Sequence, residues 1–330
     1  MDFYSMIGQN SLKDSLLRVI ESGKTGHAYL FCGPKGIGKR TAARIFAALI
    51  LCENPKEGRS CGECMPCRLI SCGTNPDYAE IDPGEGTIGV DEIRAIQAEI
   101  SLRPHYGDKK VYFVADAERM TVQAQNSLLK TLEEPPPYGV IILTTSNPSA
   151  LLETIRSRTA RYNLERNSIE EVQNLLIKKY SRTPEDAGFI ASYSGGVIGK
   201  AIELSESQDF ILIRDKVFEL LRRLKTNGPS GIFDVYAYFE EKKDEVERLL
   251  DIMLLYYRDL FILKNTGNEN LLINCDKQDI ILDDVQAYSK KELVQNIEII
   301  EATRRSISQN ANYRLAVEVM LMKLQEEAKW

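Results

Sequence analysis

The chain has 330 residues, of which 43% are hydrophobic and 27% are charged, a balance typical of soluble globular proteins with two or three domains. A net charge of −6 argues against a protein that wraps nucleic acid alone, because such proteins are usually basic, so other subunits would supply much of the charge toward DNA. No apolar run reaches the roughly 18 residues of a membrane span, and the first residues lack the pattern of a signal peptide. We therefore expect a cytoplasmic protein.

The first predicted strand, residues 28–32, leads through a glycine-rich loop into a helix predicted over residues 41–50. The loop sequence GPKGIGK completes the pattern G-x-x-x-x-G-K of phosphate-binding loops, in the strand–loop–helix context that this pattern needs. Its glycines let backbone N–H groups turn inward, and the helix N-terminus and the lysine add positive charge. The alternative is an ordinary strand-to-helix turn that keeps its glycines for shape. The candidate nucleotide-binding residues are Gly33, Gly36, Gly38, Lys39, Arg40 and Thr41.

Two departures from the phosphate-loop pattern concern magnesium. The residue after the loop lysine is Arg40, where a Ser or Thr hydroxyl normally holds the ion. In phosphate-loop enzymes a later buried strand ends in adjacent acids, but here the strand predicted over 109–116 ends in Ala115-Asp116. Alanine stands at the metal-supporting position, and Asp116 is a shorter replacement for the usual glutamate. Both changes argue against ATP hydrolysis at this site; alternatively, Asp116 simply caps the following turn.

Four cysteines after the loop and its helix have the spacing of a metal site: Cys52, Cys61, Cys64 and Cys67. The last three form two overlapping C-x-x-C pairs. Four thiolates fill a tetrahedral zinc site and leave no open position for catalysis, so we expect a structural zinc ion. A reduced, metal-free cluster and a redox pair are the alternatives. Of the other cysteines, Cys72 could compete as a ligand, whereas Cys32 and Cys275 are expected to be buried.

Further strands are predicted at residues 77–82, 109–116, 140–145 and 160–162. Their alternation with helices indicates an open, mostly parallel α/β sheet. Thr145 and Ser146 stand at a strand end, where they could either sense a phosphate or cap the strand. Arg158 precedes the last strand, and its guanidinium could bind a γ-phosphate with two parallel hydrogen bonds. From the residues alone, a pair of surface arginines, Arg156 and Arg158, is the simpler interpretation.

The strands stop after residue 165. Short helices at 168–180, 184–193 and 198–206 are predicted to form a small lid domain. Beyond residue 208 the pattern stays helical, with two apolar stripes that comprise Leu250, Met253, Leu254, Tyr257, Leu260 and Phe261, and Tyr313, Val317, Met320, Leu321 and Leu324. Such stripes are usually core, but a helical domain can also pack against sister subunits. We divide the chain into an α/β domain at 1–164 with a zinc module at about 52–67, a lid domain at 165–207 and a helical domain at 208–330.

Several motifs together resemble those of the clamp-loader branch of the AAA+ ATPases, over essentially the whole chain. They are Ile7-Gly8-Gln9, HAYLF at 27–31, the loop at 33–39, the four cysteines, NSLLKTLEEPP at 126–136, Ser157-Arg158-Thr159 and NANYRLA at 310–316. Thr159 replaces the Cys of the family's Ser-Arg-Cys motif. The resemblance implies an AAA+ phosphate-loop domain with a mostly parallel sheet, a three-helix lid and an all-α C-terminal collar that joins the subunits.

The family resemblance also implies a function. Clamp loaders are five-subunit rings that open a sliding clamp and place it on primed DNA, and each motor subunit's ATP site is completed by a neighbour's arginine finger. By motif match, Arg158 is such a finger. The implied partners are motor subunits, a clamp-opening subunit, the sliding clamp and primer–template DNA, and no membrane. Arg40, Ala115 and Lys200, which stands near the position of the motors' sensing arginine, resemble the decayed site of a non-motor subunit.

The leading interpretation is therefore a non-motor clamp-loader subunit within a DNA polymerase holoenzyme, without an ATPase activity of its own. The alternative is an active clamp-loader motor or a related AAA+ DNA-remodelling ATPase, and Arg40 and Ala115 argue against it. A small-molecule kinase fits the loop but explains neither the cysteines nor the long helical C-terminal part. Binding of ATP or ADP without hydrolysis stays open, because Lys39 and the loop glycines are retained.

Overall fold

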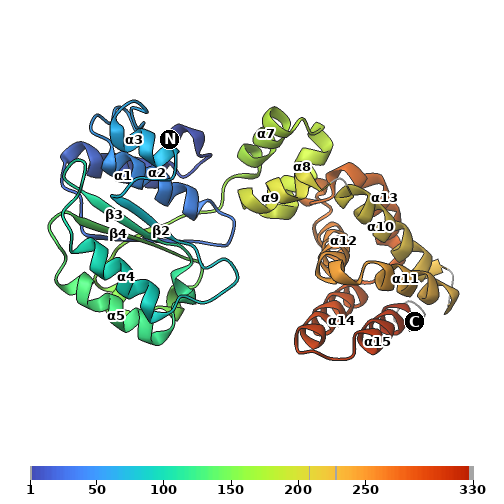
Figure 1. The fold of residues 1–330 in the computed structure, drawn as a ribbon. Helices are drawn as coiled ribbons and strands as arrows, with labels where there is room; N and C mark the ends of the chain where they lie inside the picture. The colour runs from blue at the N-terminus through green and yellow to red at the C-terminus, as the bar shows by residue number, and fades with distance from the viewer. Residues whose placement is uncertain (1, 208, 227–228, 327–330) are drawn as a thin grey trace. The chain divides into compact units, whose positions relative to one another are not determined.

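The computed structural model describes residues 2–207, 209–226 and 229–326 (Figure 1). The chain divides into two compact units, Met1–Val172 with Gly195–Lys200, and Gln173–Ser194 with Ala201–Trp330. The three-domain division inferred from the sequence stays a prediction. None of the described helices combines the length and the apolar character needed to cross a bilayer.

The first unit is built on a five-stranded parallel sheet with the strand order β2-β3-β4-β1-β5. The strands are β1 (Ala28–Cys32), β2 (Tyr78–Ile81), β3 (Lys110–Val114), β4 (Gly139–Thr145) and β5 (Ala160–Asn163). Every residue of β1, β3 and β4 is buried, because helices cover both faces of the sheet and the central strands therefore read as continuous apolar runs. The predicted α/β sheet is confirmed.

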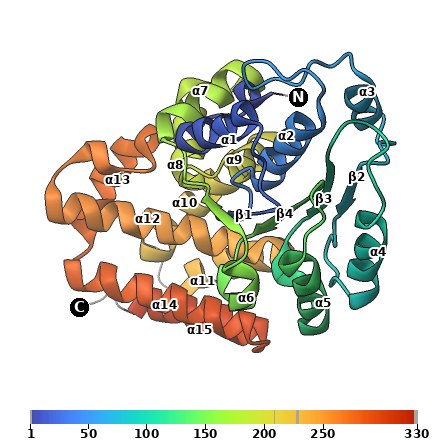
Figure 2. The same ribbon diagram turned by 90° about the vertical axis from the view of Figure 1, so that its left-hand side faces the viewer.

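Helices flank both faces of this sheet (Figures 1 and 2). One face carries α1 (Asn10–Ser22) and α2 (Lys39–Leu51), and the other carries α4 (Val90–Ile100) and α5 (Val122–Glu133), while α3 (Met65–Ser71) and α6 (Glu153–Arg156) are short. Because side chains alternate along a strand, neighbours enter different cores. Phe31 packs in the core with Phe46 of α2, whereas Leu30 packs in the core with Leu128 of α5.

The parallel register decides where polar side chains meet. All five carboxyl ends share one edge of the sheet, so the loop after β1, Asp82 after β2, Asp116 after β3 and Ser146 after β4 follow neighbouring strands. The order of strands also makes β1 the partner of both β4 and β5, with Leu30 opposite Leu143 and Arg161. Ligands of open α/β sheets bind at this carboxyl edge.

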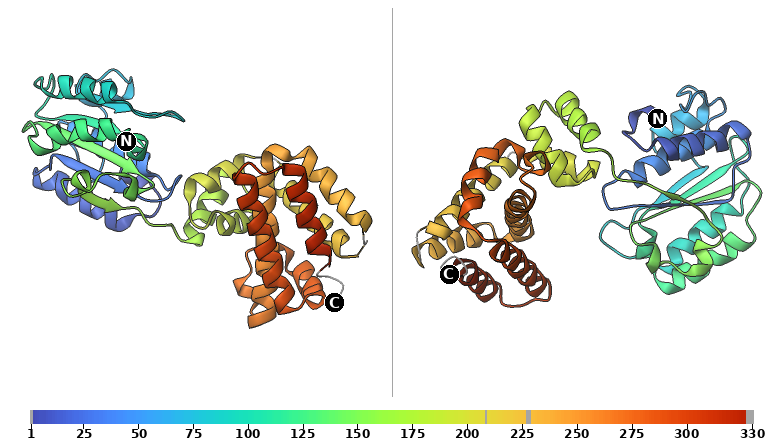
Figure 3. Two further views of the ribbon diagram at one scale, coloured as in Figure 1. Left: turned by 90° about the horizontal axis from the view of Figure 1, so that it is seen from below. Right: turned by 180° about the vertical axis from the view of Figure 1, so that it is seen from behind.

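The second unit contains helices and no strand among its described residues (Figures 1 and 3). Its helices include α8 (Pro184–Ser194), α10 (Phe210–Thr226), α11 (Pro229–Glu241), α12 (Val246–Thr266), α13 (Gln278–Asp284), α14 (Lys290–Ser308) and α15 (Tyr313–Glu326), and α7 (Ile169–Tyr180) and α9 (Ile198–Glu206) contribute their later residues. Both predicted stripes supply core residues, such as Met253 and Leu321. Cys32 is buried as expected, but the prediction for Cys275 was wrong: it is exposed, because it begins a surface 3₁₀ turn.

A buried ion pair holds part of the second unit together. Arg214 of α10 is only 1% exposed, and its guanidinium donates to the two carboxylate oxygens of Asp276 at 2.9 and 2.6 Å. The Cζ atom of its guanidinium lies over the ring of Phe189, 4.0 Å from the ring centre. An arginine tolerates such burial because its planar fork matches a carboxylate and stacks on an aromatic ring.

This pair predicts a large stability difference between two arginines of α10. We expect Arg214→Met to lower the free energy of unfolding of the second unit by about 3–5 kcal/mol, because Asp276 would keep a charge without its partner. The matched control is Arg223→Met, whose exposed pair with Glu219 should matter by less than about 0.5 kcal/mol. Urea unfolding of the full chain, followed by helical circular dichroism, measures both, and equal losses would contradict the assignment.

Candidate functional site

The glycine-rich loop between β1 and α2 has the backbone shape that its glycines predict. Gly36 and Gly38 have φ angles of +82° and +102°, a region that residues with a Cβ atom rarely adopt. Gly36 also lies against a later segment, since its carbonyl accepts a hydrogen bond of 2.8 Å from the N–H of Gly199. Any side chain at Gly199 would collide with that carbonyl, so this close approach requires glycine.

The loop lysine is turned back into the loop. The Nζ atom of Lys39 donates to the carbonyl oxygens of Gly33 at 2.8 Å and Pro34 at 3.0 Å, and the side chain is almost fully buried. Burial lowers the pKa of Lys39, and the nearby carboxylates of Asp116 and Glu118 partly oppose this shift. The ammonium group therefore lies where a phosphate-binding loop would meet an anion, with two backbone carbonyls as its present partners.

Arg40 joins the carboxyl ends of two strands. Its Nη1 atom lies 2.5 Å from Oδ2 of Asp82, which follows β2, and its Nη2 atom lies 2.8 Å from Oδ2 of Asp116, which follows β3. Burial works against the charged guanidinium, but the hydrogen bonds and charges of Asp116 and Asp82 outweigh it and raise the pKa of Arg40. The side chain of Asp116 thus binds Arg40 and makes no capping bond to the following turn.

The residues at the magnesium positions of a phosphate loop do not fit a magnesium ion. Position 40 offers a guanidinium, which has no acceptor atom, and Ala115 is fully buried and has no side-chain oxygen. The two nearby carboxylates, Asp82 and Asp116, are already bound to Arg40. Thr41, the next hydroxyl residue, is exposed on α2.

The polar residues at the end of β4 serve the local fold. Ser146 donates its backbone N–H to Oε1 of Glu118 at 2.9 Å, and its hydroxyl binds the same oxygen. Burial disfavours the charged form of Glu118, but these bonds from Ser146 prevail and lower its pKa. Thr145 is buried and accepts a hydrogen bond of 3.1 Å from the N–H of Asn147. The strand-capping interpretation of Thr145 and Ser146 is therefore the one that these contacts favour.

The four predicted metal-ligating cysteines come together. The Sγ atoms of Cys52, Cys61, Cys64 and Cys67 lie within 4.8 Å of one another, and no other such cluster of potential ligands is found in the described part of the chain. The Sγ atoms of Cys61 and Cys67 are 3.9 Å apart, close to the roughly 3.8 Å between ligands of a tetrahedral zinc ion with bonds of about 2.3 Å. Cys72 is exposed and lies outside the cluster. These four cysteines could hold a metal ion.

Backbone N–H groups already point at two of these sulfurs. The N–H of Cys61 donates to Sγ of Cys52 at 3.2 Å, and the N–H of Cys64 donates to Sγ of Cys61 at 3.4 Å. The bond from Cys64 lowers the pKa of the Cys61 thiol to about 6, whereas burial raises the pKa of Cys67 to about 12. Such N–H bonds favour the thiolate, which is the form that binds metals.

Arg158 lies near the amino ends of the strands, whereas the loop follows the carboxyl end of β1. Arg158 precedes β5, whose first residue, Ala160, pairs with Tyr29 near the start of β1, and it lines a hollow that also includes His27. The loop begins where β1 ends, so the length of this five-residue strand, roughly 16 Å, separates the two. The structure therefore does not bring Arg158 together with Lys39.

The side chain of Arg158 is partly exposed and has a carboxylate partner. Its Nη2 atom lies 3.0 Å from Oε1 of Glu133 at the end of α5, and its Nη1 atom donates to the carbonyl of Thr154 at 3.2 Å. About 37% of its side chain is accessible. These contacts hold the guanidinium at the surface of the first unit.

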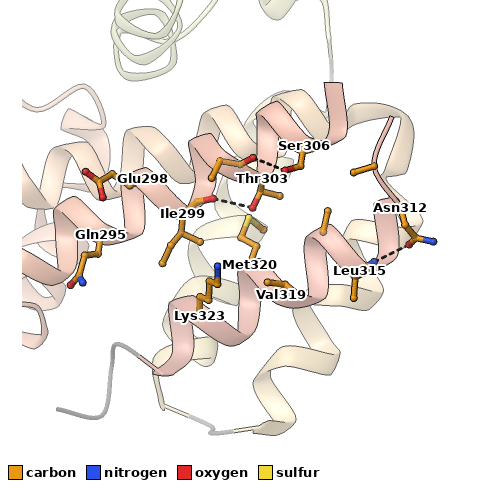
Figure 4. A pocket seen from close by; sticks show the side chains of 13 residues that line it. Gln295, Glu298, Ile299, Thr303, Ser306, Asn312, Leu315, Val319, Met320 and Lys323 are labelled. Atoms are coloured by element: carbon orange, nitrogen blue, oxygen red, sulfur yellow. Dashed lines mark hydrogen bonds between the residues drawn. The ribbon is translucent and has the colours of Figure 1, made fainter. Parts of the chain in front are cut away.

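The second unit has a groove on its surface between α14 and α15 (Figure 4). Ile299 and Thr303 of α14 line it, together with Leu315, Val319 and Met320 of α15. Leu315 and Val319 are 61% and 38% exposed, so the apolar residues of α15 extend beyond its buried stripe. Exposed apolar side chains next to a groove are typical of protein contacts.

Sequence reasoning missed four residues that contribute to these sites. Asp82 was read only as the end of a strand, and Glu133 only as part of the motif at 126–136, because neither residue is near its arginine in the chain. The position of Asp82 directly after a strand of a parallel sheet was the available signal. The spacing of Leu315 and Val319, one helical turn apart, was the signal for the second apolar face of α15.

Comparisons with known proteins agree with this architecture. Two family models match, described as DNA polymerase III, delta subunit, over residues 8–168, and DNA polymerase III, delta subunit, C terminal, over residues 208–326. The DNA polymerase III subunit delta' of Bacillus subtilis is 33% identical over 317 residues, which cover 94% of each chain. The DNA polymerase III subunit tau of the same organism is 28% identical over 98% of this chain, which spans 61% of that relative's length.

A solved structure shares the fold. A DNA polymerase III gamma subunit-related protein from Thermotoga maritima superimposes with a TM-score of 0.54 at 21% identity, covering 96% of this chain and 99% of that chain. The parallel sheet, the phosphate loop and the helical C-terminal part agree with the expected AAA+ architecture. With a delta' relative that matches along nearly its whole length, the chain belongs to the family of DNA polymerase III delta' subunits.

Proposed function

We propose that this chain is a non-motor subunit of the clamp loader of DNA polymerase III, and that Arg158 completes the ATP site of an adjacent motor subunit. The observation that carries the proposal is the position of Arg158, exposed at the sheet edge opposite the chain's own loop. An arginine in this place can serve a neighbouring molecule but not its own phosphate loop. Its partners would be the motor subunits gamma or tau and the clamp-opening delta subunit. The assembled complex would act on the sliding clamp and primed DNA in the cytoplasm.

The chemistry of a guanidinium suits this role. Its planar fork can donate two parallel hydrogen bonds to phosphate oxygens, and its charge persists at any physiological pH. In phosphoryl transfer such a group stabilises the charge of the transition state and contributes about 10³–10⁵ in rate. Arg158 needs only to exchange one anionic partner, Glu133, for another.

The chain's own nucleotide site is proposed to be idle in hydrolysis. Arg40 and Ala115 remove the hydroxyl and the carboxylate that would support magnesium, while Gly33, Gly36, Gly38 and Lys39 keep the loop shape, so ATP or ADP binding remains compatible with the site. The alternative, an active motor or a related AAA+ DNA-remodelling ATPase, has the retained loop in its favour. The ligand-poor magnesium positions favour the idle site.

We also propose that the cysteine cluster holds a structural zinc ion, because four thiolates leave no coordination position for a substrate. The two matched segments, 8–168 and 208–326, support a boundary on either side of the lid domain at 165–207. The helical domain at 208–330 would form the collar between subunits. Its groove beside the exposed residues Leu315 and Val319 supports this role.

The first prediction from this proposed function concerns Arg158. In a clamp loader reconstituted with its motor, delta and clamp subunits, Arg158→Ala and Arg158→Lys should each slow one ATP site by about 10³-fold or more, because lysine cannot reproduce the fork. A single-turnover experiment should then show one ATP fewer hydrolysed per ring. Arg94→Ala, which removes an exposed arginine of α4, is the control and should leave hydrolysis unchanged. Full hydrolysis by the Arg158 variants would remove this residue from its proposed role.

The second prediction concerns the isolated chain. Purified with its metal and without partners, it should hydrolyse ATP no faster than a buffer blank, since neither magnesium position offers a ligand. A phosphate-release assay with magnesium and primed DNA measures this rate. Turnover at the rate of a motor subunit measured in the same assay would support the active-motor alternative.

The third prediction concerns the cysteines. The purified chain should contain one equivalent of zinc by elemental analysis, and Cys64→Ser should lose most of it together with part of the thermal stability, because structural zinc contributes folding energy. Cys72→Ser is the matched control and should keep both, since Cys72 lies outside the cluster. Zinc loss in the control, or a metal-free chain of unchanged stability, would contradict the proposal.

A further inference from the structure

A guanidinium stands at the carboxyl edge of the sheet where two strands end in carboxylates. Arg40, the second residue of α2, reaches Asp82 at 2.5 Å and Asp116 at 2.8 Å. Both acids come from adjacent strands, because β2 pairs with β3. Three different elements therefore converge on one positive charge directly after the phosphate loop.

A phosphate-loop protein that uses magnesium places that ion between the first helix and the carboxyl end of a neighbouring strand. Magnesium requires oxygen ligands at about 2.0–2.1 Å in octahedral geometry and usually takes one or two carboxylates together with phosphates. Asp82 and Asp116 would be such carboxylates if they were unoccupied. In this chain their near oxygens are bound to Arg40, which carries a charge at every relevant pH and repels a second cation.

We propose that the guanidinium of Arg40 replaces the magnesium ion as an internal cation, so that the pocket excludes magnesium. Any nucleoside phosphate that enters the loop is then held without metal, by backbone N–H groups and Lys39. The substitution at position 40 is thus a change of cation, from an exchangeable ion to a fixed one, and does not merely remove a ligand. This exclusion of magnesium rests on the idle nucleotide site proposed above and not on the role proposed for Arg158.

The test compares two substitutions at this position in the full-length chain. Arg40→Ser restores a hydroxyl and frees both carboxylates, whereas Arg40→Lys keeps a fixed positive charge as the matched control. Arg40 is about one-third exposed, and such pairs contribute little to stability, so both variants should fold, which circular dichroism and thermal melting check. Binding of Mn²⁺, a paramagnetic substitute for magnesium, is followed by electron paramagnetic resonance with and without ATP, and binding of a fluorescent ATP analogue is followed in magnesium or in EDTA.

The expected result has two parts. The wild-type chain and Arg40→Lys should bind no Mn²⁺ at this site, and their affinity for the ATP analogue, whether strong or weak, should be the same in magnesium and in EDTA. Arg40→Ser should bind Mn²⁺ in the presence of ATP and should bind the analogue about tenfold or more tightly in magnesium than in EDTA, a difference of about 1.4 kcal/mol.

Two results would overturn the proposal. Magnesium-dependent binding by the wild-type chain would show that Arg40 leaves room for the ion. Absence of any metal dependence in a folded Arg40→Ser variant would show that Arg40 is not what excludes it.

Discussion

The parallel register of five strands is the constraint from which the arrangement of the first unit follows. It collects the phosphate loop, Asp82 and Asp116 at one edge of the sheet and leaves Arg158 at the other. Helices on both faces bury the central strands completely, so this separation is fixed by the core itself. On the proposed roles, the carboxyl ends of the strands would carry this chain's own nucleotide site, and the amino ends would carry Arg158, which would act on a neighbouring molecule.

At the carboxyl ends of the strands, the two cations Lys39 and Arg40 are bound by groups of the protein itself. Lys39 donates to loop carbonyls, and the single charge of Arg40 is shared by two carboxylates, so each cation has partners within the protein. On the proposed idle site, a loop that keeps its glycine geometry while its cations are engaged in this way would retain the fold of an ATPase without its metal chemistry. With the proposed zinc ion bound, the cysteine cluster would have the same character, since four thiolates would complete the coordination shell and leave no position for a reacting group.

Much of this architecture could be predicted from the sequence, because the buried strands are uninterrupted apolar runs and the glycine and cysteine motifs are local in the chain. The five strands and the helices α7 to α9 lie where the pattern placed them, within a few residues. The carboxylate partners of Arg40 and Arg158 could not be predicted. Asp82 is 42 residues from Arg40, and their contact depends on strand order, which no local pattern encodes. Cys275 was misjudged because a single apolar-type residue in a polar stretch says little about its burial.

The pair between Glu133 and Arg158 has a consequence for how the free subunit behaves before assembly. A half-exposed ion pair contributes at most about 1 kcal/mol, so it holds the arginine loosely while cancelling its charge toward stray anions. A phosphate with more than one negative charge, presented in an interface that excludes water, would bind the guanidinium more strongly than the carboxylate of Glu133 does. On the proposed role, the ion pair with Glu133 thus masks Arg158 in the unassembled subunit, and docking against a motor subunit would break the pair and free the guanidinium.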